Sequence, residues 1–227
     1  MDFTISILGT NFMETLLGRF AVGLAPVLVL VLLFAMVARL ARRRNEEKRS
    51  RAEDMIAEDD DANQTRPKDV GEELFLHAPV DKLPVKEYTE EQREKPHPAY
   101  MWQNKVLAAA DKKMLRFETP PSNVELKKMF GRTNLEFVAR YEENFVNLIH
   151  AMCHWAEALL AAEERDDARK VLEVAVDMGS EISQTYMLLA DIYAGDGEEE
   201  KLAGLKKLVE GRSFPAKNTT LTYIEGL

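Results

Sequence analysis

The chain has 227 residues, enough for one or two domains, and its 39 acidic against 30 basic residues give a net charge of −9. An acidic balance excludes general nucleic-acid binding, which needs a basic surface that displaces phosphate counterions, so we expect no nucleic-acid partner. Cys153 is the only cysteine, which excludes an internal disulfide and suits a reducing compartment.

Residues 20–38, with the sequence FAVGLAPVLVLVLLFAMVA, form an uncharged apolar run. At about 1.5 Å per residue they make roughly 28 Å of helix, close to the ~30 Å hydrocarbon core of a bilayer. A buried helix of a soluble domain normally keeps a polar stripe over such a length. We therefore predict a single transmembrane helix at 20–38, preceded by a short extracytoplasmic segment at 1–19.

The charges on either side of this run predict its orientation. Only Asp2, Glu14 and Arg19 are charged before it, whereas four arginines follow it closely: Arg39, Arg42, Arg43 and Arg44. Because Lys and Arg resist translocation, we expect a single-pass cell-membrane protein with its N-terminus outside and its C-terminal domain in the cytoplasm. The same arginines are candidates for contact with anionic lipids. In this orientation the glycosylation sequons at Asn63 and Asn218 stay unused.

Residues 39–74 are first basic and then acidic, and their apolar periodicity is soon lost, which predicts a flexible linker. Arg–Glu pairs four residues apart, such as Arg42 and Glu46, favour a few further helical turns after the membrane segment. From Phe75 onward short apolar groups alternate with prolines. Residues 75–142 are therefore interpreted as an extended arm, packed on a domain, followed by leading helices.

Beyond Ala99 apolar residues recur at the three- and four-residue spacing of buried helix faces. Ser122 and Glu125 form the pattern of a capping box, Gly131 ends that helix, and Asp166 is the expected cap of a later one. The other expected helices lie at 99–116, 134–163, 167–178, 183–193 and 198–210, before a C-terminal tail at 212–227. Short connections make neighbouring helices antiparallel, so the fold class is all-α.

The last two hairpins carry a repeat. Ala156 and Ala190 are separated by the same interval as Ala168 and Leu202. This interval, about 34 residues, is the helix–turn–helix period of tetratricopeptide repeats, so residues 143–211 resemble two units of that family. The residues that carry the resemblance are Trp155, Ala156, Leu159, Ala168, Leu172 and Ala175 in the first unit and Tyr186, Leu189, Ala190 and Tyr193 in the second. Leu202 and Val209 stand where alanines are usual, and a helical bundle with the same hairpins is the alternative.

This resemblance implies a concave surface, lined by the first helix of each unit and suited to a peptide or a partner helix. By analogy the partner-binding groove consists of Asn147, His150, His154, Glu157, Gln184, Met187 and Asp191. The function expected on this basis is that of a membrane-tethered adaptor that binds proteins at the cytoplasmic face. Self-association into a membrane scaffold is the alternative.

The strongest pattern for chemistry is His150 and His154, which are spaced to share a metal on one helix face, with Cys153 and Glu157 nearby. No second cluster of ligands, phosphate-binding loop or nucleophile motif accompanies them. We therefore expect no catalytic residue, no metal and no cofactor. A metal-binding enzyme using His150 and His154 is the weaker alternative.

Overall fold

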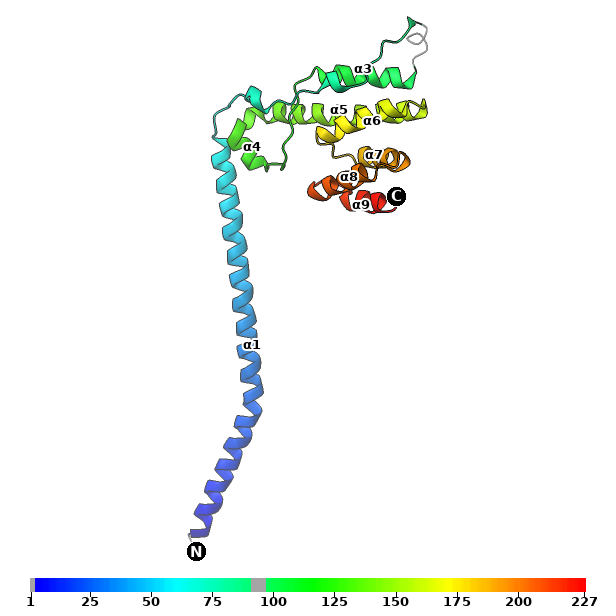
Figure 1. Cartoon of the computed structure of the whole chain (residues 1–227). Helices are drawn as coiled ribbons and strands as arrows, with labels where there is room; N and C mark the ends of the chain where they lie inside the picture. Colours follow the sequence, from blue (N-terminus) through cyan, green and yellow to red (C-terminus); the bar gives the residue numbers. More distant parts are fainter. Residues whose placement is uncertain (1–2, 91–96) are drawn as a thin grey trace. The chain divides into compact units, whose positions relative to one another are not determined.

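The computed structural model of the chain describes residues 3–90 and 97–227, with side chains from Leu30 onward. Among these residues the secondary structure is helical, no strand forms, and an isolated bridge joins Leu76 to Met114 (Figure 1). The predicted all-α class is confirmed. The chain divides into two units, Met1–Ala62 and Asn63–Leu227.

The first unit consists of one helix, α1 (Phe3–Asn63), which includes the segment predicted at 1–19 from residue 3 onward; residues 1 and 2 lie outside the described residues. The structure differs from the flexible linker predicted at 39–74, because residues 39–63 are helical. Neither glycine nor proline interrupts these residues, and alanine, arginine, lysine and glutamate have high helix propensity. Pro67 follows shortly after the end of the helix, where it cannot continue the hydrogen-bonding pattern.

Large apolar side chains of α1 are exposed over the part of the predicted membrane segment whose side chains are described. Leu30 is 66% exposed and Phe34 is 77% exposed, and most of their apolar neighbours up to Leu40 are similar. A search of the described residues finds no helix that combines the length and apolarity needed to cross a membrane. Residues 20–29 of the predicted span lie outside the residues with described side chains. The transmembrane helix therefore stays a prediction.

The second unit begins with an arm that carries two short 3-10 turns, Glu72–Leu74 and Val80–Lys82. The arm lies against the helices that follow, with its Leu83 side chain buried in their core. The backbone N–H of Lys86 donates to Gln103 Oε1 at 3.0 Å, and Gln103 Nε2 donates to the Lys86 carbonyl at 2.8 Å. This two-way amide pair involves a buried glutamine and fixes the arm on the next helix.

Two leading helices follow, α3 (Pro98–Ala110) and α4 (Asn123–Phe130). The capping box of Ser122 and Glu125 is present at α4, as predicted. The helix predicted at 99–116 ends early, because Met114 and Leu115 are extended and belong to two different apolar clusters. Successive side chains of an extended segment point in opposite directions, which a helix would not permit.

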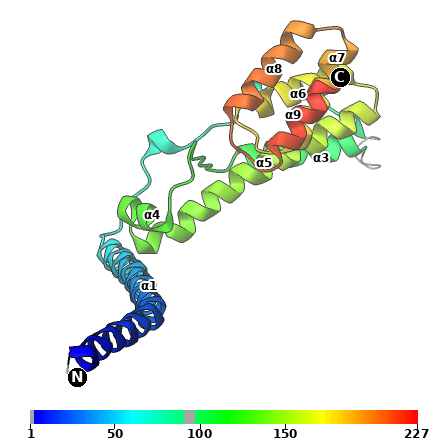
Figure 2. The ribbon, with the colours of Figure 1, turned by 90° about the horizontal axis from the view of Figure 1, so that it is seen from below.

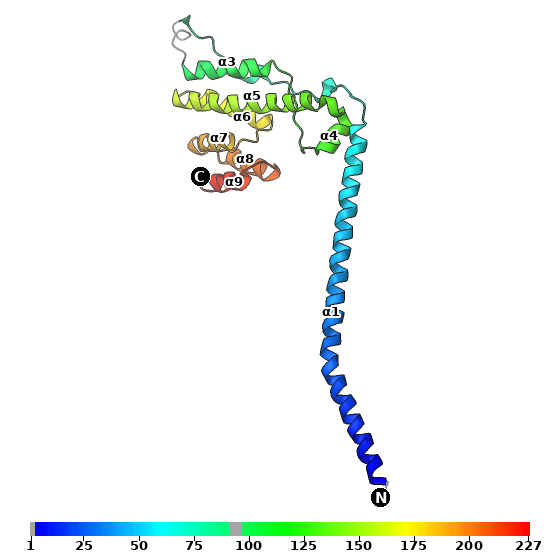
Figure 3. The same ribbon diagram turned by 180° about the vertical axis from the view of Figure 1, so that it is seen from behind.

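The main body of this unit is a series of five helices in which each packs on the one before it: α5 (Leu135–Ala161), α6 (Arg165–Asp177), α7 (Ser183–Gly195), α8 (Glu199–Gly211) and α9 (Lys217–Glu225). Figures 1 and 3 show α3 along one side of α5 and the later helices on its other side, and Figure 2 shows α9 beside α8. Helix α9 also contacts α7, so the tail expected at 212–227 contains a packed helix.

The hairpins meet through fully buried small and aromatic residues. Ala156, Ala168 and Ala190 are each 0% exposed, and Trp155 and Tyr186 fill the space between the helices. The cap predicted for α6, Asp166, is wrong: the helix begins at Arg165 with Glu164 as its N-cap. Instead the Arg165 side chain reaches the end of α7, where Nη2 donates to the Ile192 carbonyl at 2.9 Å and Nε donates to Asp196 at 3.0 Å.

Candidate docking pocket

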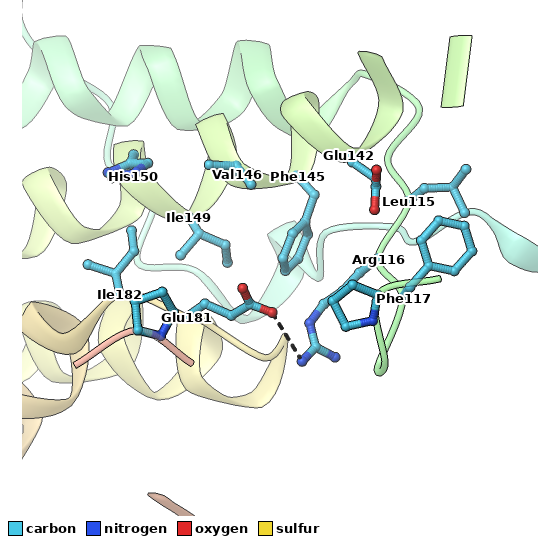
Figure 4. Close-up of a pocket in the computed structure, with 12 residues that line it drawn as sticks. Leu115, Arg116, Phe117, Glu142, Phe145, Val146, Ile149, His150, Glu181 and Ile182 are labelled. Atoms are coloured by element: carbon cyan, nitrogen blue, oxygen red, sulfur yellow. Dashed lines mark ion pairs between the residues drawn. The ribbon is translucent and has the colours of Figure 1, made fainter. Parts of the chain in front are cut away.

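An apolar pocket of about 250 Å³ opens beside the middle of α5. Figure 4 shows side chains from α5, from the segment after α3 and from the segment before α7 around it. Its lining comprises Leu115, Arg116, Phe117, Pro120, Glu142, Phe145, Val146, Ile149, His150, Glu181, Ile182 and Pro215. Two thirds of these side chains are apolar, so the pocket suits the apolar part of a ligand.

The floor of the pocket is built by the edge of the buried stripe of α5. Phe145 and Ile149 are buried, whereas Val146, between them in the sequence, is 48% exposed. Residues three or four apart lie on the same helix face, so Val146 and Ile149 are neighbours along the pocket. Ile182 and Pro215 approach from segments that precede α7 and α9. The result is an apolar surface that this unit leaves open to solvent.

Charged groups stand around this apolar floor. Glu142 is half-buried, and its pKa is raised by burial and, second, by the negative charge of Glu181. Arg116 Nη2 lies 4.0 Å from Glu181 Oε1, the limit of an ion pair. His150 stands exposed at the far end of the lining. The rim therefore carries two carboxylates and one guanidinium.

Arg116 lies against Gly179, the residue that follows the last turn of α6. Gly179 has a φ of +92°, a conformation that favours glycine, and a Cβ built there would lie 2.6 Å from Arg116 Cζ. The guanidinium thus lies directly against the Gly179 backbone. Its Nε is buried and has no hydrogen-bond partner among the described residues. A side chain at position 179 would occupy the space that this arginine fills at the edge of the pocket.

A polar cavity of about 530 Å³ adjoins the pocket and shares Arg116 and Glu181 with it. At this cavity Arg212 Nη1 donates to the Tyr186 hydroxyl at 2.7 Å, and that hydroxyl donates to the Ser180 carbonyl. Phe214 stacks on the Tyr186 ring with centroids 5.0 Å apart. Burial raises the pKa of Tyr186, so the phenol stays a hydrogen-bond donor. These contacts fasten the segment between α8 and α9.

The predicted groove residues lie on two helices, four on α5 and three on α7. All seven lie within the described part of the chain, but His150 lines the pocket and the other six are absent from its lining. His154 instead stacks on Trp102 of α3, with ring centroids 4.6 Å apart, and its Nδ1 lies 2.8 Å from Glu157 Oε2.

On the second hairpin, Asp191 accepts hydrogen bonds from the Tyr223 hydroxyl at 2.8 and 3.0 Å. Helix α9, which the sequence did not predict, therefore occupies the surface next to Asp191. Gln184 is exposed, as is Asn147 on α5, while Met187 is half-buried. The groove drawn from the repeat analogy stays a prediction, and the pocket beside α5 is a second candidate site.

The surroundings of His154 and Cys153 bear on the alternative of a metal-binding enzyme, which stays a prediction. Among the described residues no group of three or more His, Cys, Asp and Glu side chains is arranged to hold a metal ion. His154 is engaged with Trp102 and Glu157, as described above. Burial raises the pKa of Cys153 to about 11, so its thiol stays protonated and poorly nucleophilic at neutral pH.

Of the residues that line the pocket, His150 was predicted from the sequence as a binding residue and the others were not. Phe145 and Ile149 follow the apolar spacing of the helix predicted at 134–163, and Val146, an apolar residue just off that spacing, was the available signal for an exposed apolar face. Residues from 115–120, 181–182 and Pro215 join α5 through tertiary packing, which the sequence spacing does not predict. Searches of protein families, curated proteins and solved structures find no significant match to this chain.

Proposed function

We propose that this protein is a membrane-tethered adaptor, which holds a partner protein at the cytoplasmic face through the pocket beside α5. The observation that carries the proposal is the open apolar floor of that pocket, above all Val146, which is 48% exposed beside the buried Phe145 and Ile149. Contiguous exposed apolar surface on a folded domain is typical of interaction sites. A pocket of this size takes one or two side chains of a peptide or helix.

The proposed membrane tether is α1. Its apolar residues from Leu30 to Val37 are exposed on a helix that has no other helix of its own unit to cover them. Lipid is the covering that suits an uncharged run of this kind. The arginines that follow, Arg39 and Arg42 to Arg44, suit the cytoplasmic side and anionic headgroups.

The helical unit is proposed to be tetratricopeptide-like. The two alanines related by the repeat period, Ala156 and Ala190, are both fully buried, which is expected where two helices cross closely. Their hairpins, α5–α6 and α7–α8, are consecutive and packed on one another. These features support the repeat proposal through packing.

The adaptor proposal is tested by affinity capture of the tagged full chain from membranes solubilised in mild detergent. Three forms are compared: wild type, Val146→Asp at the pocket floor, and Glu143→Gln at an exposed position of the same helix. We expect a defined partner that wild type and Glu143→Gln retain and Val146→Asp loses, while all three show the same helical circular dichroism. Recovery of the same proteins by all three forms would refute docking at this pocket.

A further inference from the structure

One carboxylate of the pocket lacks a counterion. Glu142 is half-buried on α5 and makes no hydrogen bond or ion pair with any residue that the structure describes. Glu198, a half-buried carboxylate elsewhere in the unit, is by contrast paired with Arg169 at 2.8 Å and with Lys201 at 3.0 Å. An unpaired carboxylate that is partly removed from water is costly unless a ligand supplies the opposite charge.

Among the described residues of the lining, the charged groups around Glu142 supply no cation that pairs with it. Glu181, from the segment before α7, is the second carboxylate of the lining, and Figure 4 shows both acids directed towards the pocket. Arg116 is the one arginine present in the described lining, and it lies against Gly179 and nearest to Glu181. His150 is exposed at the opposite end. The charge next to the apolar floor is therefore negative on the Glu142 side.

We propose that the pocket binds a peptide segment in which a large apolar side chain adjoins a lysine or arginine. The apolar side chain would enter between Phe145, Val146 and Ile182, and the cation would pair with Glu142. This inference rests on the proposed docking function and assigns the chemical class of the partner. An acidic segment is disfavoured, because it would add a third carboxylate beside Glu142 and Glu181.

Substituting Glu142 tests this assignment without removing a structural contact. Glu142→Gln keeps the size and polarity of the side chain but removes its charge, and Glu143→Gln makes the same change at the next residue, where the side chain is exposed. The probe is a random-peptide display library, selected on the full-length chain in detergent micelles. Selected peptides are then measured by fluorescence anisotropy against wild type, Glu142→Gln, Glu143→Gln and Val146→Asp.

We expect selected peptides to carry Leu, Ile, Phe or Met next to Lys or Arg, and to lose binding to Val146→Asp. Glu142→Gln should bind them about five- to tenfold more weakly, the range for a partly buried charge pair, and Glu143→Gln should bind like wild type. Peptides that need Val146 but show no preference for a cation, or no loss with Glu142→Gln, would refute the assignment and leave the docking pocket intact. If no selected peptide needs Val146, the docking function fails as well.

The pH dependence of binding gives a second readout. The pKa of Glu142 is raised, so as pH falls this carboxyl takes up its proton early and loses its attraction for the peptide cation. The affinity of a lysine-containing peptide should therefore fall with pH in the wild type. Glu181, Arg116 and His150 face the same pocket, so the pH profiles of wild type and Glu142→Gln are compared. The part of the affinity loss that occurs in wild type and is absent from Glu142→Gln is assigned to Glu142. An unchanged pH profile in Glu142→Gln would contradict the pairing.

Discussion

Large apolar side chains are exposed in the first unit of the chain and buried in the second. In α1, Leu30 and Phe34 are largely exposed, whereas in Asn63–Leu227 residues such as Leu148 and Leu172 are completely buried. Apolar surface removed from water stabilises by about 25 cal/mol per Å² wherever the covering comes from. The helical hairpins cover one another, but a single helix cannot cover itself. The difference therefore indicates that α1 needs an external covering, which we propose is lipid.

The largest effect is expected when the chain is shortened to residues 63–227, which removes α1. Because the hairpins and the arm bury their own apolar surface, this fragment should remain folded and become soluble without detergent. Far-UV circular dichroism should show a helical spectrum with a cooperative thermal transition. A disordered fragment would mean that the second unit depends on α1, and the contrast between the units would be lost.

Within the second unit, Ala190 of α7 tests how tightly the helices pack on one another. Ala190 is 0% exposed, so Ala190→Leu has no space for its larger side chain and should cost about 1–3 kcal/mol of unfolding free energy. Glu199→Leu, at an exposed position of α8, is the matched control and should be nearly neutral. Chemical denaturation of both variants measures the difference. Equal tolerance of the two substitutions would remove the packing argument for the repeat.

A smaller effect is expected from the polar network that joins three helices. Arg169 of α6 donates to Glu198 at 2.8 and 3.0 Å and to Glu173 at 2.9 Å, and the Tyr193 hydroxyl of α7 donates to Glu173 at 2.9 Å. Arg169→Met removes the cation that Glu173 and Glu198 share, although Glu198 keeps its pair with Lys201, and should cost about 1–2 kcal/mol.

Its control is Arg140→Met on α5, where the arginine makes an exposed pair with Glu136 at 3.3 Å. Such pairs contribute about 0–1 kcal/mol, so this variant should melt close to wild type. Similar losses in both variants would show that the Arg169 network is no more important than an ordinary surface pair. Differential scanning calorimetry of the 63–227 fragment measures both.

The smallest effect concerns Glu142, whose pKa is raised in the folded state by burial and by Glu181. The folded protein therefore holds this proton more tightly than the unfolded chain, so the group stabilises at low pH and that contribution is lost as pH rises through the folded pKa. Glu142→Gln should raise the melting temperature by about 1–2 °C at pH 7. The gain should vanish below the ordinary pKa of glutamate; a gain independent of pH would contradict the electrostatic cause.

The sequence predicts an element of this structure where contacts between residues close in the chain determine it. The spacing of apolar residues predicted α5 to α8 within a few residues, because each carries a clear buried stripe. Helix α9 was missed because Lys217–Glu225 contains three threonines, which have low helix propensity, and few apolar residues. It is ordered by tertiary contacts, with Ile224 buried and Tyr223 bound to Asp191.

The candidate site was harder to predict than the helices. Of the residues expected in a groove, His150 lines the pocket, and His154 turns out to stack on Trp102 of α3, a helix much earlier in the chain. Helix periodicity tells which side of α5 is polar but not which helix lies against it. The pocket needs Arg116, Glu181 and Pro215 to meet α5, and no local pattern in the sequence encodes that meeting.

The most direct test of the membrane-tethered account is the topology of the full chain. A reporter protein that is active only in the cytoplasm is fused after Leu227, and the same fusion is made to a chain in which Arg39, Arg42, Arg43 and Arg44 are replaced by glutamine. The account predicts that the unmodified fusion remains in the membrane after alkaline extraction and is active, and that loss of the arginines lowers this activity. A fusion that alkaline extraction releases, or that is active only outside the cytoplasm, would contradict it.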